Sequence, residues 1–192
     1  MEGPHDGSKQ LLVEGAKSYP KALVAVTEFR RIVTNTITGV VTDDLDALGK
    51  ALGCELSKND VRARRRPDRI DTVVKAPSLG IKIERDADGW RQYFQVTWWN
   101  GDLDAGASIR FLKDPDALAR VVREFKGQQA KLKLAGEIGS EEDEVWLSRR
   151  LDAEQLNDLE AIMRGVMRDW IRLWSAIGGL SKRAKTVTKR MR

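Results

Sequence analysis

Acidic side chains gather in three short clusters, which are the first places where catalysis or metal binding could occur. The clusters are Asp43, Asp44 and Asp46, then Asp86 and Asp88, then Glu141, Glu142, Asp143 and Glu144. Carboxylate oxygens in such groups could hold a divalent cation, so a metal-dependent enzyme is one hypothesis. The first cluster also suits a helix start, where the helix dipole favours acids, and the others suit turns. We therefore expect these clusters to be structural, and we assign no metal, cofactor or catalytic residue to them.

Histidine and cysteine, which serve most nucleophilic and zinc-dependent sites, each occur once. His5 lies in the polar N-terminal stretch, and Cys54 follows Gly53 at the end of a helical pattern. A Ser–His–Asp triad, a histidine base or a cysteine-rich zinc site would need further residues of these types. We expect Cys54 to be a structural thiol. The sequence leaves enzymatic activity undecided and favours a protein without it.

The tryptophans are more informative, because all six lie in the predicted sheet or the closing helix, from residue 90 onward. Trp98 and Trp99 are adjacent on a predicted strand, so they must point to opposite faces of a sheet. One of the two can enter a core, and the other is left for a partner. The candidate partner-binding residues are therefore Trp90, Trp98 and Trp99. For Trp146, Trp170 and Trp174 we predict core packing.

Basic side chains concentrate in two segments, which are candidates for contact with nucleic acid or an acidic partner. The first contains Arg62, Arg64, Arg65, Arg66 and Arg69, and the second contains Lys182, Arg183, Lys185, Lys189, Arg190 and Arg192. The whole chain has 34 basic and 29 acidic residues, so the rest of the protein is close to neutral without the second segment. Such segments bind phosphates without sequence preference, with an affinity that falls as salt rises. Solvation of both segments is the competing interpretation.

The elements that must position these residues begin with helix. Residues 1–17 are predicted as a disordered lead. Ser18 and Pro20 suit a helix start, and apolar residues recur at spacings of three and four from Leu23 to Leu52. We expect one bent helix or two helices over residues 18–56, the second beginning near Thr42. Residues 57–78 are predicted as an arginine-rich connector.

The remainder predicts an α+β domain over residues 79–180, mainly an antiparallel sheet packed against helices. Strands are expected at 79–84, 90–99, 107–112 and 144–151, with a short strand over 131–137. Asp114 and Pro115 suit the start of one helix, and Asp152 with Gln155 suits the start of another that ends at Gly178. Residues 181–192 are predicted as a disordered basic tail.

This order of elements resembles the YbjN and type III secretion chaperone-like fold over about residues 79–178. The matching patterns are the helix at Leu118–Phe125, the strand at Glu144–Arg149 and the closing helix at Leu156–Trp174. The resemblance implies a non-enzymatic role in binding proteins, often as a dimer. It supplies no catalytic residue. The long helical segment before residue 57 and the arginine connector depart from the compact form of that fold.

The leading hypothesis is therefore a non-enzymatic protein-interaction module or chaperone-like adaptor, with a protein partner or a second copy of the chain. The alternative is a nucleic-acid-associated accessory protein that uses the arginine connector and the basic tail. No apolar run approaches the roughly 20 residues of a membrane helix, and residues 1–9 lack the apolar core of a signal peptide. We expect a cytoplasmic protein without a membrane partner.

Overall fold

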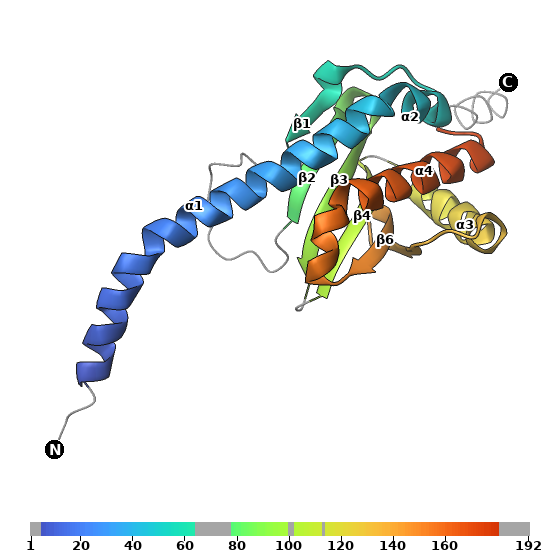
Figure 1. Cartoon of the computed structure of the whole chain (residues 1–192). Coiled ribbons are helices and arrows are strands. Elements are labelled where there is room, and N and C mark those ends of the chain that lie inside the picture. Colours follow the sequence, from blue (N-terminus) through green and yellow to red (C-terminus); the bar gives the residue numbers. More distant parts are fainter. Residues whose placement is uncertain (1–4, 64–77, 100–101, 113, 181–192) are drawn as a thin grey trace, which may run out of the picture.

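The chain folds as an α+β protein in which four α-helices lie on one side of a six-stranded antiparallel sheet (Figure 1). This computed structural model describes residues 5–63, 78–99, 102–112 and 114–180, with only the backbone for residues 5–13 and 99. The strands are β1 (Val61–Ala63), β2 (Ser78–Arg85), β3 (Trp90–Trp99), β4 (Asp102–Phe111), β5 (Glu137–Ser140) and β6 (Glu144–Leu151). Their order across the sheet is β1-β2-β3-β4-β6-β5. Within the described residues, no helix combines the length and apolar character needed to cross a membrane.

The N-terminal region forms one long helix, α1 (His5–Asp43), followed by the short α2 (Leu45–Leu52). The predicted break near Thr42 is confirmed. The predicted disordered lead is wrong for residues 5–17, which are helical, and Pro20 lies inside α1 rather than in its first turn. Proline removes one backbone hydrogen bond, but the helix continues on both sides of it. Figure 1 shows that the first half of α1 projects away from the sheet and the other helices.

The predicted strands at 79–84, 90–99 and 144–151 are confirmed as β2, β3 and β6, while β4 begins earlier than the predicted 107–112 strand. The 131–137 strand is wrong, because α3 (Pro115–Leu132) extends into it and β5 begins only at Glu137. Asp114 caps α3 as predicted, accepting a hydrogen bond from the backbone N–H of Ala117 at 2.8 Å. Within the predicted connector, residues 58–60 form a short 3-10 helix and β1 pairs with β2.

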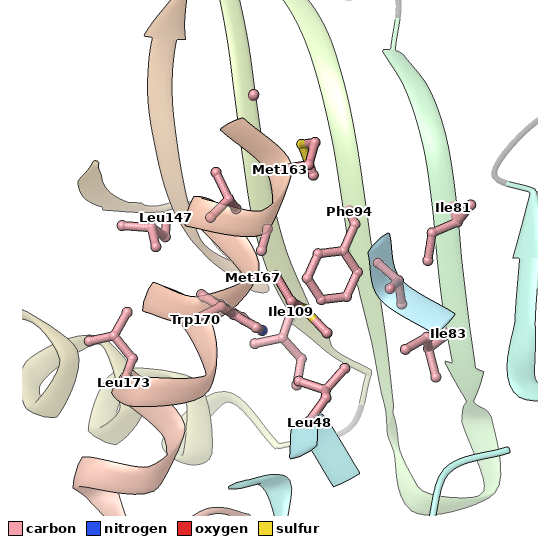
Figure 2. Close-up of a cluster of buried hydrophobic side chains, with 14 of the residues drawn as sticks. Leu48, Ile81, Ile83, Phe94, Ile109, Leu147, Met163, Met167, Trp170 and Leu173 are labelled. Atoms are coloured by element: carbon pink, nitrogen blue, oxygen red, sulfur yellow. The ribbon is translucent and has the colours of Figure 1, made fainter. Parts of the chain in front are cut away.

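The closing helix α4 (Leu159–Ile177) lies across the middle of the sheet. Asp152 and Gln155 form the predicted cap, with the Asp152 N–H donating to Gln155 Oε1 at 3.0 Å, but a 3-10 segment (Ala153–Asp158) precedes α4. Gly178 ends the helix with a φ of 77°, as predicted. Figure 2 shows side chains of α4 packed against Phe94, Ile109 and Leu147 of the sheet.

Each strand has a helix-covered face and an open face, because successive side chains point in opposite directions. Along β4, the side chains under the helices are Leu103, Ala105, Ala107, Ile109 and Phe111. The alternate residues of β4, which lie on the open face, are Asp102, Asp104, Gly106, Ser108 and Arg110. No described helix packs on the open face, which is therefore the surface of the sheet available to a ligand (Figure 1).

Candidate functional site

Most of the acidic residues that could have held a metal instead form ion pairs. Arg164 of α4 bonds Asp43 at 2.9 Å, Arg91 of β3 pairs with Asp86, and Arg110 of β4 bonds Glu144 at 3.0 Å. In the part of the chain that the structure describes, no group of three His, Cys, Asp or Glu residues is placed to hold a metal ion. These clusters therefore join elements of the fold.

The single cysteine offers no activated thiol. Cys54 is half-buried just after α2, and burial raises the pKa of its thiol above the usual value, although Arg85 opposes the rise. A raised pKa leaves less thiolate, which is the reactive form. Cys54 is thus a poor nucleophile at neutral pH.

The tryptophans whose side chains are described lie in two environments. Some belong to the core between the helices and the sheet, and Trp146 lies on the open face. Trp90 is buried on the helix-covered face, and Trp98 on the same face is partly buried, with its ring 5.9 Å from that of Phe29 in α1. The side chain of Trp99 lies outside the described residues. Trp170 and Trp174 are buried in an aromatic cluster with Phe125 of α3, as predicted.

Trp146 differs from its prediction, because it lies on the open face and not in the core. It is half-buried, while its neighbours Val145 and Leu147 point to the helices and are buried. Its indole lies over Gly139 of the adjacent strand, where an added Cβ would come within 2.4 Å of the ring. Because Gly139 has no side chain, the indole can pack directly against the backbone of β5.

Of the basic residues proposed to contact nucleic acid, only one falls within the described residues. Arg62 lies exposed on β1, opposite Lys82 of β2. The other members of both segments lie outside the described residues: Arg64, Arg65, Arg66, Arg69, Lys182, Arg183, Lys185, Lys189, Arg190 and Arg192. The nucleic-acid hypothesis therefore stays a prediction.

A groove of about 430 Å³ crosses the open face over β3, β4 and β6. Its floor is low at Gly106, which has Gln95 of β3 on one side and Ser148 of β6 on the other. One end is walled by Ser108 and Trp146, which are paired across the strands, and the other by Thr97, Asp104 and Arg150. The remaining lining residues are Ser78, Asp102, Ala107, Glu141, Glu144 and Leu147.

The groove is acidic and rich in hydrogen-bond acceptors. It has four carboxylates against one guanidinium, Arg150, which bonds Asp102 at 2.8 Å. Asp104 has neither a hydrogen bond nor an ion pair to any described residue, and burial raises its pKa although the nearby Arg150 opposes the rise. Ser108 is only 2% exposed, and neither its hydroxyl nor the buried Oε1 of Gln95 has a described partner.

A second exposed feature is the first half of α1, where an apolar stripe continues past the domain. Tyr19, Val26, Val33 and Val40 are seven residues apart, which places them along one side of the helix. Val33 and Val40 are 2% and 1% exposed, because this half of α1 packs against α4 and β2. Tyr19 and Val26 are 63% and 47% exposed. The apolar stripe is therefore covered by α4 and β2 from Val33 onward and is exposed to solvent at Val26 and before it.

The sequence interpretation missed both of these surfaces, although each has a signal in the sequence. From Asp102 to Arg110, every second residue of β4 is charged or small, which marks an open face of a strand. The apolar pattern that predicts the helix begins at Leu23, and a stripe of that length exceeds what the sheet of a small domain can cover.

Comparisons with protein-family models, with curated proteins and with solved structures gave no match for this chain. The function therefore has to be inferred from the geometry of the chain itself.

Proposed function

We propose that this chain is a protein-interaction module, without catalytic activity of its own, which binds an apolar surface of another protein chain along the first half of α1. The single observation that carries the proposal is the exposure of Tyr19 and Val26 on the same stripe that buries Val33 and Val40. Stripes of this kind mark surfaces that bind protein when they are not covered within the fold.

The stability of the projecting helix supports the same proposal. Isolated helices of fewer than about 12–15 residues are marginal in water, and an interior proline costs about 3 kcal/mol or more. The projecting half of α1 contains Pro20 and exposes Tyr19, Val24 and Val26. Such a helix gains most of its stability from packing against something else. A partner that continues the apolar surface of α4 and β2 would supply that packing.

The resemblance to the YbjN and type III secretion chaperone-like fold agrees with a protein-binding role but stays a prediction. The element order on which it rests is β2–β3–β4, then α3, then β5–β6, then α4. Since that fold is often dimeric, a second copy of the chain is the first partner to test.

Double substitution Tyr19→Glu with Val26→Glu tests the proposal. Charges at these positions prevent burial of the stripe, so we expect association to weaken by tenfold or more, which corresponds to about 1.4 kcal/mol. The matched control is Val24→Glu, because Val24 is 70% exposed but points away from the stripe. Static light scattering measures self-association of the three proteins. A photo-cross-linking amino acid at position 26 or 24 captures and identifies any other partner in the host cell.

Two outcomes would support the proposal: a dimer that dissociates only in the double variant, or a defined cross-linked protein obtained from position 26 and not from position 24. A monomeric chain with equal cross-linking from both positions would contradict it.

A further inference from the structure

We propose that the groove on the open face binds the guanidinium group of an arginine side chain, presented by an extended peptide. This site is separate from the stripe on α1, because it lies on the side of the sheet that the helices leave free.

The charge of the groove selects a cationic ligand. The protein carries a net charge of +5, yet the groove is lined by Asp102, Asp104, Glu141 and Glu144, with Arg150 as its one basic residue. Arg150 bonds Asp102, and Glu144 bonds Arg110, so Asp104 and Glu141 are the carboxylates that the described structure leaves without an ion pair. The negative lining disfavours phosphates and nucleic acid at this site.

The hydrogen-bonding groups of the groove further restrict the chemical class of ligand that it can bind. The hydroxyl of Ser108 is buried and has no described partner, and the same is true of Gln95 Oε1. Together with the carboxylates of Asp104 and Glu141, they make the groove rich in acceptors, although its hydroxyl groups can also donate. Guanidinium has five N–H donors and no acceptor, so it fits such a surface better than a sugar hydroxyl, which both donates and accepts.

Size and shape agree with an arginine side chain. Asp104 and Ser108 are four residues apart on β4, or about 13 Å at 3.3 Å per residue. Gly106 lies between them and has no side chain to fill the groove. A Cβ at this position would lie 2.7 Å from the Leu147 carbonyl oxygen, so a larger residue would not fit without a shift of the strands. The indole of Trp146 lies at the other end beside Ser108, where it offers an apolar surface to the peptide. An arginine side chain can thus lie over Gly106 with its guanidinium at Asp104, while the main chain of the peptide passes Ser108 and Trp146 at the other end.

Isothermal titration calorimetry on the full chain tests this proposal with four probes. They are N-acetyl-arginine amide, a Gly-Ser-Arg-Ser-Gly peptide, the same peptide with citrulline in place of arginine, and a neutral glucose trisaccharide. We expect the arginine peptide to bind at least tenfold more tightly than the citrulline peptide, which has the same shape but no charge. Tighter binding of the peptide than of the amide would assign the natural source to a polypeptide. Equal binding would assign it to a small guanidine, which would overturn the peptide part of the proposal.

Three variants place the ligand in the groove. Asp104→Asn should weaken binding of both the arginine amide and the arginine peptide by about tenfold, because it removes the charged partner of the guanidinium. Ser108→Ala should weaken binding of the peptide alone, by about fivefold, because Ser108 lies at the end of the groove that the peptide main chain passes. The matched control is Asp116→Asn, an exposed residue at the start of α3 on the helix-covered side, which should bind as the unaltered chain does. Circular dichroism before titration confirms that each variant is folded.

Binding of the trisaccharide but not of arginine would overturn the proposal, and so would equal affinities for the Asp104→Asn and Asp116→Asn variants. The Tyr19→Glu with Val26→Glu variant should bind arginine normally. This result separates failure of the groove proposal from failure of the proposed function.

Discussion

Asp104 shows how the position of one residue on a strand decides its chemistry. Its neighbours Leu103 and Ala105 are buried under the helices, whereas Asp104 points into the acidic groove on the other side. Partial burial there makes the charged form less favourable than in water, and the pKa rises. A positively charged ligand beside Asp104 would stabilise the charged carboxylate and so offset the free-energy cost of its partial burial.

The raised pKa of Asp104 predicts a dependence of stability on pH. Since the pKa is higher in the folded than in the unfolded state, the folded state binds more protons, and the free energy of unfolding falls as pH rises between the two values. Asparagine cannot ionise. Asp104→Asn should therefore be more stable than the unaltered chain at pH 7, and the difference should disappear toward the ordinary aspartate pKa of 3.8. Urea unfolding over this range measures it. A difference that does not change with pH would contradict the prediction.

Single residues also mark the limit of what the sequence could predict about the site. Trp146 follows Val145 and precedes Leu147, and a run of three apolar residues does not show which of them faces the core. The period of two resolves the ambiguity only over the whole strand, where Val145, Leu147 and Leu151 alternate with Glu144, Ser148 and Arg150. The unpaired hydroxyl of Ser108 has no sequence signal, because it depends on contacts across three strands.

Among the elements, those with strong end signals were predicted well. Asp114 caps α3 and Gly178 ends α4 as expected, because capping depends on contacts within a few residues. The end of α3 was missed, since the alternation Lys131-Leu132-Lys133-Leu134 is typical of a strand. The helix instead continues to Leu132, and Lys133 ends it in the left-handed conformation at a φ of 49°.

The helix end at Lys133 predicts a stabilising substitution. For a residue with a Cβ, the left-handed conformation costs about 1 kcal/mol of conformational free energy, whereas glycine adopts it without this cost. Lys133→Gly should therefore raise the free energy of unfolding by about 0.5–1 kcal/mol. The same substitution at exposed Lys126, inside α3, should lower it by about 1 kcal/mol. Chemical denaturation of both variants gives the two values, and a loss of stability at both positions would show that Lys133 does not limit the helix end.

On the scale of the whole molecule, stability is distributed unevenly. The second half of α1, α2, α3 and α4 share one apolar core with the sheet, whereas the first half of α1 has no packing partner in the described chain. Segments without buried contacts open locally at little cost in free energy. The sequence predicted the helix itself from about residue 20. It could not predict which part of the helix is buried, because that depends on how far α4 and the sheet extend along it.

This uneven stability predicts the course of limited proteolysis. Trypsin should cleave the isolated chain after Lys21, in the projecting half of α1, well before it cleaves after Lys50, which is also exposed but lies on the packed helix α2. Mass spectrometry over a time course orders the two cuts. Cleavage at equal rates would mean that the projecting helix is as stable as the domain, and protection of Lys21 at high protein concentration would indicate self-association.

The projection of α1 also governs how the protein diffuses. Its 39 residues make a rod of about 58 Å at 1.5 Å per residue, and only about half of that rod is covered by the domain. Frictional drag depends on shape as well as mass, so one copy of this chain should migrate in gel filtration like a larger sphere. An early elution peak would resemble a dimer even for a single chain. Two copies paired along α1 would instead add mass without a matching gain in length, so the frictional ratio should fall when the chains associate.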